Sequence, residues 1–144
     1  MTESRTFEGG CHCGNVKVTV QLVSAPLNYE LRACDCDFCT KHRAVYLSDP
    51  QGKLVLYFND DNKVGIYKHG ADLAEMIFCP VCGVYIGALY KEPPEIFGAV
   101  NARIFSEGFG PEVVVSPKLL GPDEKTARWK DLWFSDVQVI NNVR

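Results

Sequence analysis

The sequence predicts one small, mostly β domain that is held together by bound metal. Its 144 residues match the usual size of a single domain, and 47% hydrophobic residues supply enough apolar side chains for a core. Apolar and polar residues alternate along the first half of the chain, as they do in half-buried strands. All seven cysteines lie in short-spaced clusters, which favours metal binding over disulfide pairing. We therefore expect an all-β, zinc-stabilised fold over residues 1–144.

The strands are expected in chain order from this alternation. Residues 16–22 place valine or leucine at every second position, with lysine, threonine and glutamine between them. Leu27, Tyr29 and Leu31 repeat the same period of two. Turn-prone stretches at 59–62 and 69–72 then separate further apolar runs. These runs predict strands at 53–58, 63–67, 75–78, 84–89, 96–100 and 113–115.

At most one short helix is expected, at residues 123–132. Pro122 and Asp123 provide a start signal, and Trp129, Leu132 and Trp133 provide an apolar face at helical spacing. We expect the aromatic residues at 129, 133 and 134 to belong to the core or to an interface. Proline and glycine are spread along the chain, so neither a linker nor a second domain is expected.

Charge and hydropathy argue against two classes of partner. The net charge is −3, and the chain has no basic run that could neutralise several phosphates, so no nucleic acid is expected. No apolar run reaches the roughly 20 residues that cross a bilayer, and residues 1–10 lack the apolar segment of a signal peptide. We expect no membrane partner and a cytoplasmic location, with the nucleus as the alternative. Oligomeric state is not predicted.

The spacing of the cysteines predicts zinc. The motifs are Cys-X-Cys at Cys11 and Cys13, Cys-X-Cys-X-X-Cys at Cys34, Cys36 and Cys39, and Cys-X-X-Cys at Cys79 and Cys82. Side chains two apart in an extended segment share a face, and Gly83 can take the positive φ of a tight turn. A tetrahedral zinc site can add about 10 kcal/mol or more to folding. An iron–sulfur cluster, a redox dithiol and inert buried thiols are the competing interpretations.

Seven cysteine sulfurs are enough for one closed metal site of four ligands and one open site of three. The cysteines can be assigned to these two sites in two ways. One division joins Cys36 and Cys39 to Cys79 and Cys82, leaving Cys11, Cys13 and Cys34. The other joins Cys11 and Cys13 to Cys79 and Cys82, leaving Cys34, Cys36 and Cys39. We prefer the second, because three ligands within six residues form a self-contained half-shell. His12 and His42 adjoin the clusters and are weaker candidate ligands, and His69 is expected to be an exposed turn residue.

Three segments resemble the glutathione-dependent formaldehyde-activating enzyme family, which includes centromere protein V. They are residues 10–14, residues 34–41 and residues 78–83, and residues 100–103 are similar to a family segment near the ligand groove. The resemblance implies an Mss4-like tent of coiled antiparallel β-sheets with two zinc ions. It also implies a structural zinc on Cys11, Cys13, Cys79 and Cys82, and a second zinc with an open position on Cys34, Cys36 and Cys39.

The activity that the resemblance implies is the carbon–sulfur lyase-type condensation of glutathione with formaldehyde to S-(hydroxymethyl)glutathione. Cys34, Cys36 and Cys39 would form the catalytic site, with glutathione or a related thiol as the small-molecule partner and another small aldehyde as an alternative co-substrate. The candidate contacts to the thiol's carboxylates are Lys41, Arg43, Asn101 and Arg103. Arg43 stands where many relatives carry glycine, so a cation could narrow the groove or bind a carboxylate there.

Ionisation of the thiol sets the scale of the expected catalysis. A thiol with a pKa near 8.5 is only a few per cent ionised at pH 7, so full ionisation accelerates attack by at most about thirtyfold, roughly 2 kcal/mol. Positioning of the aldehyde must supply the rest. The main alternative is a non-catalytic, zinc-stabilised protein-binding module, and a third is an Mss4-like exchange-factor chaperone with one zinc. Zinc content and its removal by a chelator distinguish these functions.

Overall fold

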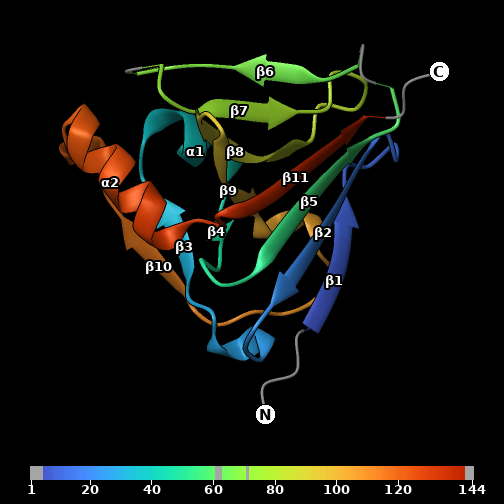
Figure 1. Ribbon diagram of the computed structural model, residues 1–144, viewed down its shortest axis with the longest axis horizontal. Helices are drawn as coiled ribbons and strands as arrows, with labels where there is room; N and C mark the ends of the chain where they lie inside the picture. The colour runs from blue at the N-terminus through green and yellow to red at the C-terminus, as the bar shows by residue number, and fades with distance from the viewer. Residues whose placement is uncertain (1–4, 61–62, 71, 142–144) are drawn as a thin grey trace.

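The part of the chain that the structure describes contains two β-sheets and two helices (Figure 1). The structure is a computed structural model, which describes residues 5–60, 63–70 and 72–141. The smaller sheet has four strands in the order β1, β2, β5, β11. The pairs β1–β2 and β2–β5 are antiparallel, whereas β11 runs parallel to β5. The strand bounds are β1 (Arg5–Gly10), β2 (Val16–Leu22), β5 (Lys53–Phe58) and β11 (Asp136–Asn141).

The larger sheet has seven strands in the order β10, β3, β4, β9, β8, β7, β6. All of its pairs are antiparallel except β10 with β3. Its strands are β3 (Leu31–Cys34), β4 (Tyr46–Leu47), β6 (Gly65–Tyr67), β7 (Glu75–Phe78), β8 (Tyr85–Glu92), β9 (Glu95–Asn101) and β10 (Glu112–Val115). The helices are α1 (Asp37–His42) and α2 (Pro122–Leu132), with 3₁₀ turns η1 (Pro26–Asn28), η2 (Ala102–Ile104) and η3 (Pro117–Leu119).

The predicted all-β class is confirmed, and most of the predicted strands are present. Strands β2, β5 and β7 have the expected bounds, and β6, β8, β9 and β10 overlap the other predicted runs. The strand expected over residues 27–31 is wrong, because Pro26 begins the 3₁₀ turn η1 and Leu27 is 72% exposed. Proline sets the φ angle that such a turn needs at its start, so the apolar alternation there does not report burial.

The predicted helix at 123–132 corresponds to α2, which begins one residue earlier at Pro122. Glu124 accepts a hydrogen bond from the Gly121 amide at 3.2 Å and so caps its first turn. The six-residue helix α1 was not predicted, since it is too short for helical periodicity. Its start depends on Cys36, whose sulfur accepts a hydrogen bond from the Cys39 amide.

The main core lies between the two sheets. Strand β2 buries every second side chain, and Val16, Val18, Val20 and Leu22 are each no more than 1% exposed. They pack with the alternate residues of β5 and with buried side chains of the larger sheet, including Leu47, Ile86 and Val100. Alternation in the sequence therefore corresponds to burial wherever a strand has the second sheet over one face.

A second buried cluster supports the functional site. It contains Cys39 of α1, Tyr46 of β4, Tyr85 of β8 and Trp133 at the end of α2. Figure 1 shows α1 and α2 on the same side of the molecule, near β3 and β10. Within the described part of the chain, no helix combines the length and the apolar character that crossing a membrane requires.

Candidate functional site

Four cysteines from two distant loops meet in one group, here called the four-cysteine group. Cys11 and Cys13 follow β1, while Cys79 and Cys82 lie between β7 and β8. Their sulfur atoms all lie within 4.8 Å of one another. Cys79 is fully buried and Cys13 is exposed, so the group sits at the surface end of the core.

The two loops have the same local geometry. The amide of Cys11 donates to the carbonyl of Val16 and the amide of Cys79 donates to the carbonyl of Val84, both at 3.0 Å. Each loop turns at a glycine with positive φ, 86° at Gly14 and 83° at Gly83. The turn predicted at Gly83 is therefore present, and glycine provides it without steric cost. The repeated turn brings each cysteine pair to one side of its loop.

The four-cysteine group fits a tetrahedral metal ion. Sulfurs that lie 2.3 Å from a common zinc are about 3.8 Å apart. The Cys11–Cys13 and Cys13–Cys79 sulfur distances are 3.7 and 3.6 Å, and all seven cysteines are free of disulfides. Burial raises the pKa of Cys82, but amide donors including that of Val84 outweigh it and lower the pKa to about 6. The group can thus present ionised sulfur to a metal ion.

Cys34, Cys36 and Cys39 form a second group, here called the three-cysteine group. Cys34 ends β3, Cys36 caps α1, and Cys39 lies within α1. Their sulfurs also lie within 4.8 Å of one another. Hydrogen bonds from Cys34 and then from Cys39 lower the pKa of Cys36, so this thiol is poised to ionise. The preferred division of the seven cysteines is confirmed, and neither His12 nor His42 joins a group.

A chain of buried phenols supports Cys39. The Tyr46 hydroxyl lies 3.0 Å from the Cys39 sulfur and 2.8 Å from the Tyr85 hydroxyl, which donates to the Met76 sulfur at 3.5 Å. Burial raises the pKa of Tyr46 and of Tyr85 well above the ordinary value, so both remain protonated at neutral pH. When Cys39 is a thiolate, Tyr46 must donate its single hydrogen to Cys39, and the Tyr85 hydroxyl then donates to Tyr46 in place of Met76.

Replacing Tyr46 with phenylalanine should lower the metal affinity of the three-cysteine group by about 10- to 100-fold, because outer hydrogen bonds stabilise and orient ligands. The affinity is measured by chelator competition, with the thiolate-to-cobalt absorption band of Co²⁺-loaded protein as a second readout. Tyr90→Phe is the control, because the Tyr90 hydroxyl bonds to Glu92 at 2.8 Å, away from the cysteines. Equal affinities for wild type and Tyr46→Phe would show that the phenol does not stabilise the site.

The three-cysteine group faces a cavity of about 320 Å³, whereas no member of the four-cysteine group lines it. Trp129 and Trp133 form part of its wall and are stacked with ring centroids 4.8 Å apart. Leu73 and Met76 add further apolar surface. The charged residues of the lining are Arg32, Asp37, Lys118, Lys125 and Arg128. The cavity is therefore apolar in part and carries an excess of positive charge.

Two aromatic residues lie where the sequence did not place them. His69, expected in an exposed turn, is half-buried, lines the cavity and stacks on Phe38 at 5.1 Å. Its Nε2 atom is buried and has no hydrogen-bond partner among the described residues. Trp129 and Trp133 both line the cavity, and Trp133 and Phe134 are buried as expected. The sequence of a turn such as 68–70 does not reveal which side chain from elsewhere in the fold will pack against it.

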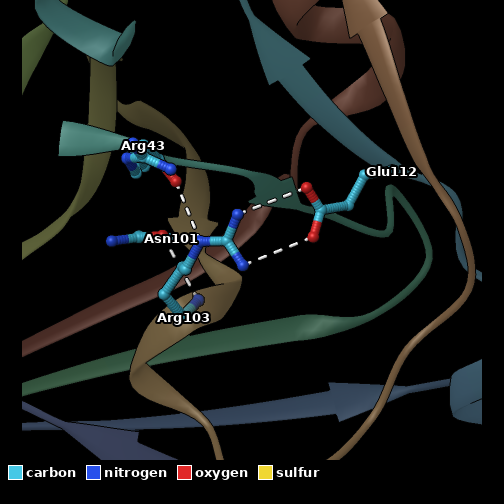
Figure 2. A network of polar contacts seen from close by, with 4 residues as sticks. All are labelled: Arg43, Asn101, Arg103 and Glu112. Atoms are coloured by element: carbon cyan, nitrogen blue, oxygen red, sulfur yellow. Dashed lines mark hydrogen bonds and ion pairs between the residues drawn. The ribbon is translucent and has the colours of Figure 1, made fainter. Parts of the chain in front are cut away.

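Figure 2 shows three of the four predicted carboxylate contacts in a separate polar network. The Arg103 side chain donates to the Arg43 carbonyl at 2.9 Å and forms an ion pair with Glu112 at 3.2 Å. The Arg103 amide donates to the Asn101 side chain at 3.2 Å, and Lys41 is exposed on α1. None of Lys41, Arg43, Asn101 and Arg103 lines the cavity. Their contact with a substrate stays a prediction.

The cations that do line the cavity were not among the sequence candidates. Arg32 lies on β3, Lys118 on η3, and Lys125 and Arg128 on α2. They come from separate segments, so no local motif marks them. Lys125 and Arg128 do share a helix face at a spacing of three, but exposed helix faces commonly carry such cations.

No protein-family model matches the chain. The structure is similar to the crystal structure of a Rhodobacter sphaeroides protein, with a TM-score of 0.54 and 26% sequence identity. The match covers 74% of this chain and 99% of that protein. The likeness supports a shared fold over about three quarters of the chain.

Proposed function

We propose that the protein is a zinc-dependent carbon–sulfur lyase-type enzyme, which condenses glutathione or a related thiol with formaldehyde or another small aldehyde. The observation that carries this proposal is the three-cysteine group at the wall of a 320 Å³ cavity. The resemblance of the cysteine segments to the glutathione-dependent formaldehyde-activating family supports the same chemistry.

The two cysteine groups differ in the way that structural and catalytic zinc sites differ. Four protein ligands complete a tetrahedral shell, whereas three leave one position free. We assign the four-cysteine group to a structural zinc and Cys34, Cys36 and Cys39 to a second zinc. When bound there, zinc would supply an open coordination position that keeps an incoming thiol ionised at neutral pH. Tyr46 orients Cys39 for this role through their 3.0 Å hydrogen bond.

The cavity suits a small polar thiol and an aldehyde. Its volume of about 320 Å³ lies at the lower end of the range of about 300–1,000 Å³ that small-molecule sites occupy. The stacked indoles of Trp129 and Trp133 exclude water from one wall. Exclusion of water favours addition of sulfur to the aldehyde over its hydration, and the walls hold both reactants close together.

The reaction balances without an oxidant or a reductant. The thiol loses its proton, a carbon–sulfur bond forms at the aldehyde carbon, and the carbonyl oxygen takes up a proton to become a hydroxyl. His69 is suited to this last step, because the residue lines the cavity and its buried Nε2 has no hydrogen-bond partner among the described residues. We assign Nε2 to hydrogen bonding with that oxygen.

The test is the rate of adduct formation at equal glutathione and formaldehyde, with and without the zinc-loaded protein. Exchange between free and hydroxymethylated glutathione can be measured by nuclear magnetic resonance. We expect acceleration that includes up to about thirtyfold from thiol ionisation. Cys39→Ser should return the rate to that of the uncatalysed reaction.

Thr40→Ser is the matched control, because Thr40 is the exposed neighbour of Cys39 on α1. It should retain the wild-type rate. Circular dichroism should show that Cys39→Ser remains folded, so that lost activity reports on the site. A rate that the wild-type protein does not raise would contradict the enzymatic proposal and favour the zinc-stabilised protein-binding module.

A further inference from the structure

The cavity lining carries more positive than negative charge. Its lining includes four cations and one acidic residue, Asp37. Lys118 has a distant ion pair with Asp35 at 3.9 Å. Arg32 and Arg128, by contrast, form no ion pair with any residue that the structure describes. Two guanidinium groups thus share the lining of one cavity, and neither is held in an ion pair by a described residue.

Arg32 is held in place by neutral partners. One of its terminal nitrogens donates to the Ser48 hydroxyl at 2.5 Å, and that hydroxyl donates to the Leu132 carbonyl at 2.6 Å. This chain links β3 to the end of α2 and fixes the guanidinium at the cavity wall. A guanidinium has five N–H donors, so most of those of Arg32 remain available to a ligand.

The two arginines also affect each other electrostatically. Burial, and then the charge of Arg128, lower the pKa of Arg32 to about 10. A negatively charged group beside both side chains would offset burial and mutual repulsion together. Lys125, three residues before Arg128 on α2, adds a third positive charge to the same lining.

We propose that Arg32 and Arg128 form a carboxylate subsite, which makes the cavity select thiols that carry a carboxylate over neutral thiols. Guanidinium groups bind carboxylates through paired, charge-assisted hydrogen bonds, so two of them can both hold and orient such a ligand. The selection of thiols rests on the proposed function, whereas the carboxylate subsite stands on the arginine pair alone. Arg103 is not part of it, since Glu112 already occupies that guanidinium.

Three probes separate the thiol from the carboxylates. Glutathione has both, S-methylglutathione keeps the carboxylates without a free thiol, and glutathione diethyl ester keeps the thiol without carboxylates. Binding of each to the zinc-loaded protein is measured by isothermal titration calorimetry. Arg128→Gln should weaken the binding of glutathione and of S-methylglutathione about tenfold and leave the ester unchanged, as expected for one lost charged hydrogen-bonding partner.

Lys130→Gln is the matched control, because it removes one positive charge from the same helix outside the cavity lining. Lys130 pairs with Glu92 at 2.8 Å, and its loss should alter none of the three affinities. Arg32→Lys, which keeps the charge but not the paired donors, should also weaken the two carboxylate probes.

The outcomes separate this subsite from the proposed function. If Arg128→Gln weakens the binding of S-methylglutathione, the carboxylate subsite is supported. If the diethyl ester does not bind the wild type, that result counts against the thiol chemistry and leaves the subsite unaffected. Equal binding of ester and glutathione to the wild type overturns the subsite and leaves the thiol chemistry standing. Failure of S-methylglutathione to bind the wild type, or its displacement by inorganic phosphate at lower concentration than by acetate, also overturns it.

Discussion

Replacing Cys79 with serine should unfold the protein. Cys79 is fully buried, and its sulfur lies 3.6 Å from that of Cys13 in the four-cysteine group. A structural zinc site contributes about 10 kcal/mol or more, which equals or exceeds the total stability of about 5–15 kcal/mol of most domains. The substitution removes a metal ligand and leaves a hydroxyl in a closely packed place. Circular dichroism and zinc content per chain measure the result.

Cys36→Ser provides the contrast, and we expect it to remain folded. The four-cysteine group joins positions that are 66 residues apart, as Cys13 and Cys79 show. The three-cysteine group lies within one segment of six residues and closes no long loop. Closing a long loop removes much more entropy from the unfolded chain than closing a short one. Cooperative unfolding of Cys79→Ser at the wild-type temperature would contradict the structural role of its group.

Replacing Phe134 with alanine should lower the free energy of unfolding by about 3–5 kcal/mol. Phe134 is fully buried and is the largest of the side chains with almost no exposure. Its amide and carbonyl both bond to Gly98, at 2.9 and 3.0 Å, and so tie the segment before β11 to β9 of the other sheet. The substitution leaves a cavity where the two sheets meet, and the surrounding side chains relax only partly.

Urea unfolding followed by tryptophan fluorescence measures this loss. Leu119→Ala is the control for removal of an apolar side chain, because Leu119 is 79% exposed and lies on η3. We expect its effect to stay within about 0.5 kcal/mol. A loss below about 1 kcal/mol in Phe134→Ala would mean that the site collapses around the smaller side chain and that the aromatic ring is not essential to the join.

The three-cysteine group could be predicted from the sequence because the closeness of neighbouring cysteines is a local property. Cys34, Cys36 and Cys39 are close in any backbone that turns once between them, and the structure brings their sulfurs together as expected. Counting ligands left two divisions open, and the preference for pairing Cys11 and Cys13 with Cys79 and Cys82 rested on the compactness of the other three cysteines. The long strands β2 and β5 were equally predictable, since one face of each is covered by the other sheet.

The edge strand β11 and the short inner strand β4 were not predictable on the same grounds. Strand β11 has only two half-buried residues, Val137 and Val139, among exposed neighbours, and β4 has only two residues. Such strands exist because a neighbouring strand offers hydrogen-bonding partners, and that depends on the sheet more than on their own side chains. Leu27 illustrates the reverse case, an apolar residue at strand spacing that remains exposed.

The sequence by itself determined the class of the fold and the short cysteine motifs, and it favoured the division into groups of four and three that the structure has. The alternation of a strand and the spacing of a cysteine motif depend on residues a few positions apart, whose relative placement follows from backbone geometry. Only the tertiary structure decided that Arg32, His69 and Arg128 border one cavity with the three-cysteine group. They come from β3, from the loop after β6 and from α2, and only long-range packing brings such segments together.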